Sequence, residues 1–211
     1  GLFLYLIFGQ NFRKQKTISK KSLRFAANRP HVSFDIDRLN PNLMDNNQLN
    51  LIRLLYTNSD AKAYPNNKID ILSDGKTTFD AMFNAIQNAK NHIHIEFFIF
   101  GNDKISNQLR ELLIEKASAG VRVRMIYDYW GSFFLSRWYL QSLREAGVYL
   151  RPFLPLRLRL GRSKINYRNH RKILIVDGEV GFTGGLNVAD RYIFGNALGM
   201  WRDTFVRFEG S

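Results

Sequence analysis

Apolar positions after residue 67 alternate between the spacing of a strand and the spacing of a helix. Short or alternating apolar runs predict strands at residues 69–72, 92–100, 121–128, 148–150, 173–176, 181–183 and 205–209. Apolar residues three and four apart predict helices at 77–90, 106–120 and 132–146, with a short helix from about residue 188. Strands that alternate with helices predict an α/β domain whose sheet is flanked by helices on both faces.

The first 66 residues lack this alternation. Residues 1–9 are uniformly apolar, too few for the ~20 residues of a spanning helix, and a basic cluster follows them. This order predicts a transmembrane-helix stump and a basic juxtamembrane segment at 1–24, with the rest of the chain on the cytoplasmic side. The alternatives are a short buried helix or a signal-peptide remnant, although in a signal peptide the charges precede the apolar run. We expect residues 25–66 to form a linker with a short helix. Residues 67–211 are expected to form a single domain.

Charge limits the choice of partners. The chain of 211 residues has 31 Lys and Arg against 18 Asp and Glu, a formal net charge of +13. Such an excess predicts a negatively charged partner, either nucleic acid or an anionic lipid surface. The chain has no cysteine, which excludes disulfides, Cys-ligated zinc and a Cys nucleophile.

The candidate chemistry lies in the stretch 169–178, a polar entry followed by an apolar run and an Asp-Gly turn. His170 and Lys172 are two residues apart, so on a strand they point to the same face. A neutral imidazole can attack phosphorus, and a fixed ammonium can hold the non-bridging oxygens as charge builds on them. Gly184 and Gly185 follow, where backbone can approach a ligand closely, and Asn187 adds an amide donor.

The pattern His-x-Lys-x-x-x-x-Asp followed by Gly-Gly-x-Asn closely resembles the HKD motif of the phospholipase D superfamily. His170, Lys172 and Asp177 fill the motif. The sequences of residues 169–178, 181–190 and 201–204 also resemble the N-terminal half of bacterial cardiolipin synthases. The resemblance runs from about Asp70 to the last residue, and more loosely back to residue 1. It implies a phospholipase D-like half with a mixed rather than wholly parallel sheet.

The resemblance also implies a mechanism. His170 is the expected nucleophile and forms a phosphohistidine, while Lys172 and Asn187 bind the phosphoryl oxygens. Asp203 is the candidate partner of the imidazole, and Asp177, at the turn, is expected to hold the loop more than to touch substrate. The implied reaction transfers a phosphatidyl group between two phosphatidylglycerol molecules and releases glycerol, without a cofactor or a metal.

A metal site is the alternative interpretation of one strand. His92, His94 and Glu96 share a face of the strand at 92–100, and two His with one Glu are zinc ligands in other proteins. The resemblance to a family that needs no metal argues against this. Glu96, nearer the carboxyl end of its strand, is instead expected to border the active site.

The chain departs from the family pattern in one respect. Phospholipase D enzymes use two such motifs that face each other across one site, whereas this sequence contains one. His31, His92 and His94 all lack a Lys two residues on. We therefore expect a C-terminal half or a second copy of the chain to complete the site. Two other classes stay open: a single-motif phosphodiesterase or nuclease active as a homodimer, and a non-catalytic lipid-binding module. The apolar start with its basic flank makes nucleic acid the less favoured partner.

Two segments have both a plain and a functional interpretation. The aromatic run 129–134 is either core or an acyl-chain entrance at the membrane interface. The basic stretch 151–168 is either a solvated loop or a loop that faces anionic headgroups. The apolar start with its basic flank, together with the resemblance, leads us to expect the protein at the bacterial inner membrane, with the catalytic part on the cytoplasmic side.

Overall fold

The structure is a computed structural model that describes residues 45–59, 67–155 and 168–210. Residues 68–210 belong to one compact unit, and the helix before them belongs to another. That helix, α3 (Asn46–Ser59), falls within the segment predicted to contain a short helix. It begins with a reciprocal cap, because Gln48 N–H donates to the Asp45 carboxylate and Asp45 N–H donates to the Gln48 side chain.

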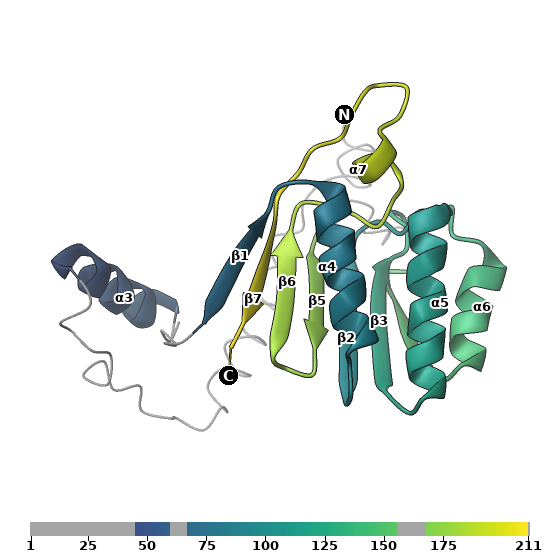
Figure 1. Cartoon of the computed structure of the whole chain (residues 1–211), viewed down its shortest axis with the longest axis horizontal. Helices are drawn as coiled ribbons and strands as arrows, with labels where there is room; N and C mark the ends of the chain where they lie inside the picture. The colour runs from purple at the N-terminus through teal and green to yellow at the C-terminus, as the bar shows by residue number, and fades with distance from the viewer. Residues whose placement is uncertain (1–44, 60–66, 156–167, 211) are drawn as a thin grey trace, which may run out of the picture. The chain divides into compact units, whose positions relative to one another are not determined.

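The compact unit is built on a seven-stranded mixed sheet in the order β1-β7-β6-β5-β2-β3-β4 (Figure 1). The strands are β1 (Lys68–Leu72), β2 (His92–Phe97), β3 (Arg122–Asp128), β4 (Tyr149–Phe153), β5 (Lys172–Val176), β6 (Val180–Gly184) and β7 (Phe205–Glu209). Strands β2, β3 and β4 pair in parallel, whereas β5 and β7 are antiparallel to every neighbour. The predicted mixed sheet is confirmed.

The three long helices of this unit lie on one face of the sheet. They are α4 (Gly75–Gln87), α5 (Lys104–Ser118) and α6 (Arg137–Glu145), and each connects two strands that run in the same direction. Such crossovers are right-handed, and all three step the same way along the strand order, so the helices come to lie side by side (Figure 1). Among the described residues, the prediction of helices on both faces is therefore wrong.

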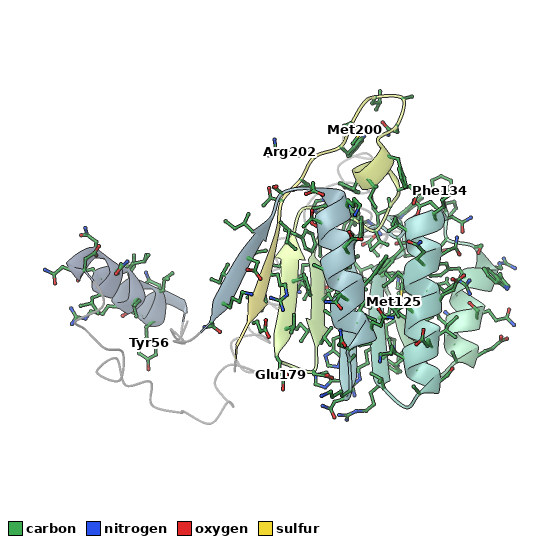
Figure 2. All side chains as sticks on the ribbon, in the orientation of Figure 1. Tyr56, Met125, Phe134, Glu179, Met200 and Arg202 are labelled. Atoms are coloured by element: carbon green, nitrogen blue, oxygen red, sulfur yellow. The ribbon has the colours of Figure 1, made fainter. Side chains whose placement is uncertain are left out.

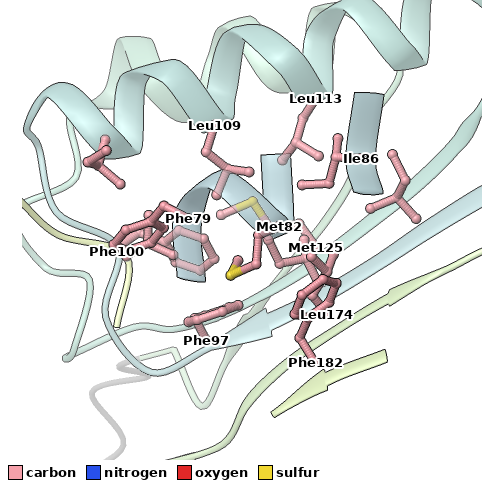
Figure 3. Close-up of a cluster of buried hydrophobic side chains, with 14 of the residues drawn as sticks. Phe79, Met82, Ile86, Phe97, Phe100, Leu109, Leu113, Met125, Leu174 and Phe182 are labelled. Atoms are coloured by element: carbon pink, nitrogen blue, oxygen red, sulfur yellow. The ribbon is translucent and has the colours of Figure 1, made fainter. Parts of the chain in front are cut away.

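The core fills the space between these helices and the sheet (Figure 3). The inward face of β2 carries Ile93, Ile95 and Phe97, all buried, as its alternation predicts. Phe79 and Met82 of α4 are packed against this face in the same buried cluster. The opposite face of the sheet is more open: Ile69 and Ile71 of β1 are exposed, and His92, His94 and Glu96 are half-buried.

Helix starts differ from the predictions by up to five residues. Helix α4 begins at Gly75, capped by the Asp74 carboxylate that accepts from Thr77 N–H at 2.8 Å. Helix α6 begins only at Arg137, with Ser136 as its cap, so residues 129–134 form turns instead of helix. A polar side chain that satisfies the free N–H groups of the first turn fixes each start.

The short helix α7 (Arg191–Phe194) also begins later than predicted. The predicted transmembrane stump at 1–24 lies outside the described residues. Within the described ranges, no helix is both long enough and apolar enough to cross a bilayer.

Candidate active site

The predicted site residues other than Asp177 gather at one edge of the sheet, where the carboxyl ends of its parallel strands meet. Strand β5 enters the sheet there, and Lys172 pairs in register with Phe97 at the end of β2. Strand β6 ends at the same edge with Gly184, which pairs with Phe205 at the start of β7. This edge is where open α/β sheets bind ligands.

His170 and Lys172 contact each other directly at this edge. Nζ of Lys172 lies 3.0 Å from Nδ1 and 3.3 Å from Nε2 of His170, and it donates to the His170 carbonyl oxygen at 2.9 Å. The imidazole is exposed, and one side of it lies against Phe98, with ring centroids 4.8 Å apart. Because an ammonium has only donors, the ring nitrogen that faces it acts as the acceptor and keeps its lone pair. A lone pair on an imidazole nitrogen is what attack on phosphorus needs.

Lys172 is buried although it carries a charge. Burial lowers the pKa of its ammonium, and the nearby charge of Asp203 partly opposes this. Among the described residues no carboxylate lies within salt-bridge distance of Nζ. A buried cation without a close counter-ion favours a bound anion, such as a phosphoryl group.

Gly184 and Gly185 form a close approach between two chain segments. A Cβ on Gly184 would overlap the Thr204 carbonyl oxygen, and one on Gly185 would overlap the Asp203 carboxylate. The paired glycines therefore give room for Asp203 beside Lys172. The predicted contact between Asp203 and the imidazole is not among the hydrogen bonds of the structure, in which the Asp203 carboxylate accepts from Thr204 N–H.

Asn187 is buried and its amide is engaged on both sides. Its oxygen accepts from Ile99 N–H at 3.1 Å, and its nitrogen donates to the Tyr192 hydroxyl at 2.9 Å. One amide hydrogen remains after these two bonds. Asn187 thus connects the segment after β2 to α7.

Three polar side chains, those of Glu96, Asn169 and Asp128, hold the segment that leads into His170. Of these, only Glu96 was predicted from the sequence. The Asn169 side-chain amide donates to the Glu96 carboxylate, and Asn169 N–H donates to Asp128 at 3.1 Å. The Asp128 carboxylate, fully buried, also accepts from the N–H groups of Trp130 and Gly131. Glu96 therefore borders the site through Asn169. For Asp128 the only available signal was an acidic residue at the end of a buried strand.

The structure places Asp177 at the opposite end of β5 from His170. Its carboxylate accepts from the N–H groups of Lys90, Asn91 and His92, each at 2.8 Å, so it ties the β5–β6 turn to the start of β2. Burial alone would raise the pKa of Asp177, but these N–H groups outweigh it and hold the pKa below its ordinary value. Asp177 is not brought to the imidazole.

His92 and His94 lie together, with ring centroids 4.9 Å apart, but Glu96 of the same face is turned to Asn169. In the part of the chain that the structure describes, no three His, Asp or Glu side chains converge as metal ligands.

Comparison with known proteins then decides the family. Residues 82–197, more than half of the chain, match the family described as the cardiolipin synthase, phospholipase D-like domain. The chain belongs to this family. The resemblance predicted from His170, Lys172 and Asp177 is thereby confirmed.

Curated members of this cardiolipin synthase family are similar over the whole chain. Cardiolipin synthase 2 of Bacillus cereus is 40% identical over 215 aligned residues, which cover 100% of this chain and 41% of the relative. A cardiolipin synthase of Oceanobacillus iheyensis is 41% identical over 217 residues and is covered to 45%. The chain thus spans less than half the length of these relatives.

Solved structures add the fold. NucT from Helicobacter pylori superposes with a TM-score of 0.53 at 16% identity, covering 68% of this chain and 86% of that protein. Together with the family match, this likeness shows that the domain has a phospholipase D-type α/β fold. His170 and Lys172 lie at its sheet edge.

Proposed function

We propose that this domain carries the nucleophilic half of a phosphatidyltransferase that makes cardiolipin. A ring nitrogen of His170 attacks the phosphorus of one phosphatidylglycerol, the bond from phosphorus to the headgroup glycerol oxygen breaks, and glycerol leaves. A second phosphatidylglycerol then attacks the phosphohistidine through its free hydroxyl, which restores the imidazole and gives cardiolipin. The observation that carries the proposal is the 3.0 Å contact of Lys172 with His170 at the ligand-binding edge of a domain of this family.

Lys172 has the role of the charge stabiliser. As the phosphorus becomes five-coordinate, negative charge builds on its non-bridging oxygens, and a buried ammonium already in place stabilises that charge without reorganising. The remaining amide hydrogen of Asn187 is the second proposed donor to these oxygens. Asp203 beside Lys172, and Glu96 through Asn169, position the pair.

A second acid is needed for turnover. The glycerol that leaves needs a proton and the incoming hydroxyl must lose one, and His170 cannot do either while it is bonded to phosphorus. Of the four histidines in the chain, His170 alone has a Lys two residues on. We propose that the acid is the histidine of a second motif, in a C-terminal half or in a second copy of this chain.

The proposal also places the domain on the cytoplasmic side of a bacterial cell membrane, with residues 1–24 as its anchor. This placement rests on the sequence, where a basic cluster follows the apolar run of residues 1–9.

The test combines native mass with turnover of phosphatidylglycerol in detergent, for the chain alone and mixed with a chain that carries a second His-x-Lys motif. We expect an inactive monomer that gains cardiolipin synthesis in the mixture. Acid-labile phosphate trapped on the protein should disappear in His170→Ala and persist in His94→Ala, a control imidazole outside the site.

The alternative, supported by the net charge of +13, is a homodimeric phosphodiesterase or nuclease. A dimer that hydrolyses DNA or a simple phosphodiester, makes no cardiolipin, and loses its activity in His170→Ala would overturn phosphatidyl transfer. Cardiolipin synthesis by a homodimer alone would instead remove the need for a separate C-terminal half.

A further inference from the structure

Two loops at the active-site edge expose large apolar side chains. The loop after β3 carries Trp130, Phe133 and Phe134, and Trp138 follows at the start of α6; Phe134 is 84% exposed. After α7 begins a second loop with Leu198, Met200 and Trp201, of which Leu198 is 86% exposed. We call these seven residues the apolar rim.

Each part of the rim is connected by contacts to a residue of the proposed site. In one part, Trp130 is followed by Gly131, which packs so closely on Phe98 that a Cβ would overlap it, and Phe98 lies against the His170 ring. In the other part, the Trp201 ring lies 5.9 Å from that of Tyr192, whose hydroxyl is held by Asn187. In Figure 2, Phe134 and Met200 both project from the upper edge, at the loops that carry the rim.

The rim has the composition of a membrane interface. All three tryptophans of the chain belong to it, and each is exposed. Exposed clusters of large apolar side chains mark sites of contact with proteins or membranes. Tryptophan is enriched where an apolar ring meets a polar boundary, as at the headgroup level of a bilayer.

Cations accompany the aromatic rings. The Arg191 guanidinium lies 4.9 Å from the centre of the Trp201 ring, and that of Arg168 lies 5.9 Å from the Trp130 ring. Arg137 and Arg202 adjoin the rim in sequence and are exposed. Arg168 forms an ion pair with Asp128 at 3.6 Å. The charges of Arg191, Arg137 and Arg202 attract a surface of anionic headgroups while the apolar side chains enter the layer beneath it.

We propose that the apolar rim seats this domain on an anionic phospholipid bilayer, with its aromatic side chains in the interface and His170 facing the headgroups. A lipid substrate would then present its phosphodiester to the catalytic pair without leaving the layer. The inference rests on the proposed function only for the identity of the lipid. It needs no turnover, and is therefore tested by binding.

The test uses the intrinsic fluorescence of the full chain with vesicles of phosphatidylglycerol or phosphatidylcholine. The rim holds every tryptophan, so the emission reports on this surface whatever other segment also binds the vesicle. With phosphatidylglycerol we expect a blue shift, and quenching by lipids that carry bromine on the acyl chains. Phosphatidylcholine should give a weaker response that salt does not change.

Variants separate the rim from other exposed apolar positions. Phe134→Ser with Leu198→Ser should weaken the fluorescence-detected partitioning by about tenfold or more, because two apolar side chains no longer enter the interface. Ile69→Ser with Ile71→Ser removes two exposed apolar side chains of β1 and should leave the quenching unchanged.

Two results would overturn the inference. One is sedimentation of the chain with vesicles while brominated lipids fail to quench the tryptophans. The other is a blue shift without lipid that grows with protein concentration, which would make the rim an interface between copies of the chain. His170→Ala should keep the quenching. A chain that inserts, yet gives no cardiolipin even when mixed with a chain that carries a second His-x-Lys motif, would refute the proposed function alone.

Discussion

Nζ of Lys172 reaches the ring and the backbone carbonyl oxygen of the same residue, His170, at 3.0 Å and 2.9 Å. The ammonium therefore fixes both the position of the imidazole and the chain segment that carries it. Its burial means that this arrangement exists before substrate arrives, as electrostatic preorganisation requires.

Replacing this lysine should separate chemistry from folding. Lys172→Met keeps a long side chain but removes the charge, so we expect turnover to fall by roughly 10²-fold or more in the preparation that makes cardiolipin. Stability should hold or rise, since an apolar group of similar shape replaces a buried charge. Arg171→Met, at the exposed neighbouring position, is the control for both measurements. Full activity in Lys172→Met would exclude the proposed role.

Activity should fall at alkaline pH earlier than for an ordinary lysine. Burial lowers the pKa of Lys172, so the ammonium is present below that lowered pKa and is lost as pH rises through it. Turnover measured from pH 6 to 10 tests this against Lys172→Arg, whose guanidinium stays charged over the whole range. The variant is expected to be slower but without the alkaline decline, and an identical decline in both proteins would assign it to another group.

The amide of Asn187 offers a test of two roles at once. Asn187→Ala leaves Ile99 N–H and the Tyr192 hydroxyl without their partner, at a cost of about 1–3 kcal/mol in unfolding free energy. Tyr192→Phe removes only the hydroxyl and frees an amide hydrogen, so it should cost less. If Asn187 also binds phosphoryl oxygens, turnover in Asn187→Ala should fall further than in Tyr192→Phe at temperatures where both variants are folded. Equal turnover would leave Asn187 a structural role only.

Gly185 should be intolerant of a side chain because of one neighbour. A Cβ there meets the Asp203 carboxylate, so Gly185→Ala is expected to displace Asp203 from Lys172 and to reduce both stability and turnover. In an Asp203→Ala background the same change should cost clearly less. A double-mutant cycle on unfolding free energy and on rate measures this coupling. Additive effects would mean that the glycine is required for another reason.

Asp177 should contribute to acid stability without contributing to catalysis. Its pKa is lowered in the fold, so its stabilisation is fully present above the unfolded pKa of ~3.9 and is lost as pH falls through the folded value. Asp177→Asn keeps the shape and tolerates the positive φ of 55°. Urea unfolding should show a deficit of roughly 1–3 kcal/mol at pH 7 that shrinks near pH 3. A pH-independent deficit would contradict this account.

The strands and the catalytic pair could be predicted because their signals are local. Alternation assigned Ile93 and Ile95 to the buried face of β2, and the two-residue spacing placed His170 and Lys172 together. Which face of the sheet the helices cover could not be predicted from such local signals. It depends on the direction in which successive crossovers step along the sheet, and so on a strand order fixed by pairings such as that of β1 with β7.

The residues that surround His170 and Lys172 could not be predicted from the sequence pattern either. Asn169 meets Glu96 across 73 positions of the chain, and Ile99 meets Asn187 across 88. None of these contacts changes the spacing of apolar residues in the segments that make it, so the spacing gives no sign of them. The start of α6 was missed because Phe133 and Phe134 match the helical spacing of the apolar residues that follow, whereas the cap that decides the start is Ser136.

The chain enters and leaves the sheet at one place. Lys68 at the start of β1 and Glu209 at the end of β7 are partners in register, at the sheet edge away from the catalytic pair. A domain whose two ends adjoin can be inserted into another protein, or closed by a short linker and reopened elsewhere, while its strands keep their neighbours. Because its two ends adjoin, the domain Lys68–Glu209 is suited to insertion into another protein and to circular permutation. Neither change would alter the sheet edge that carries the catalytic pair.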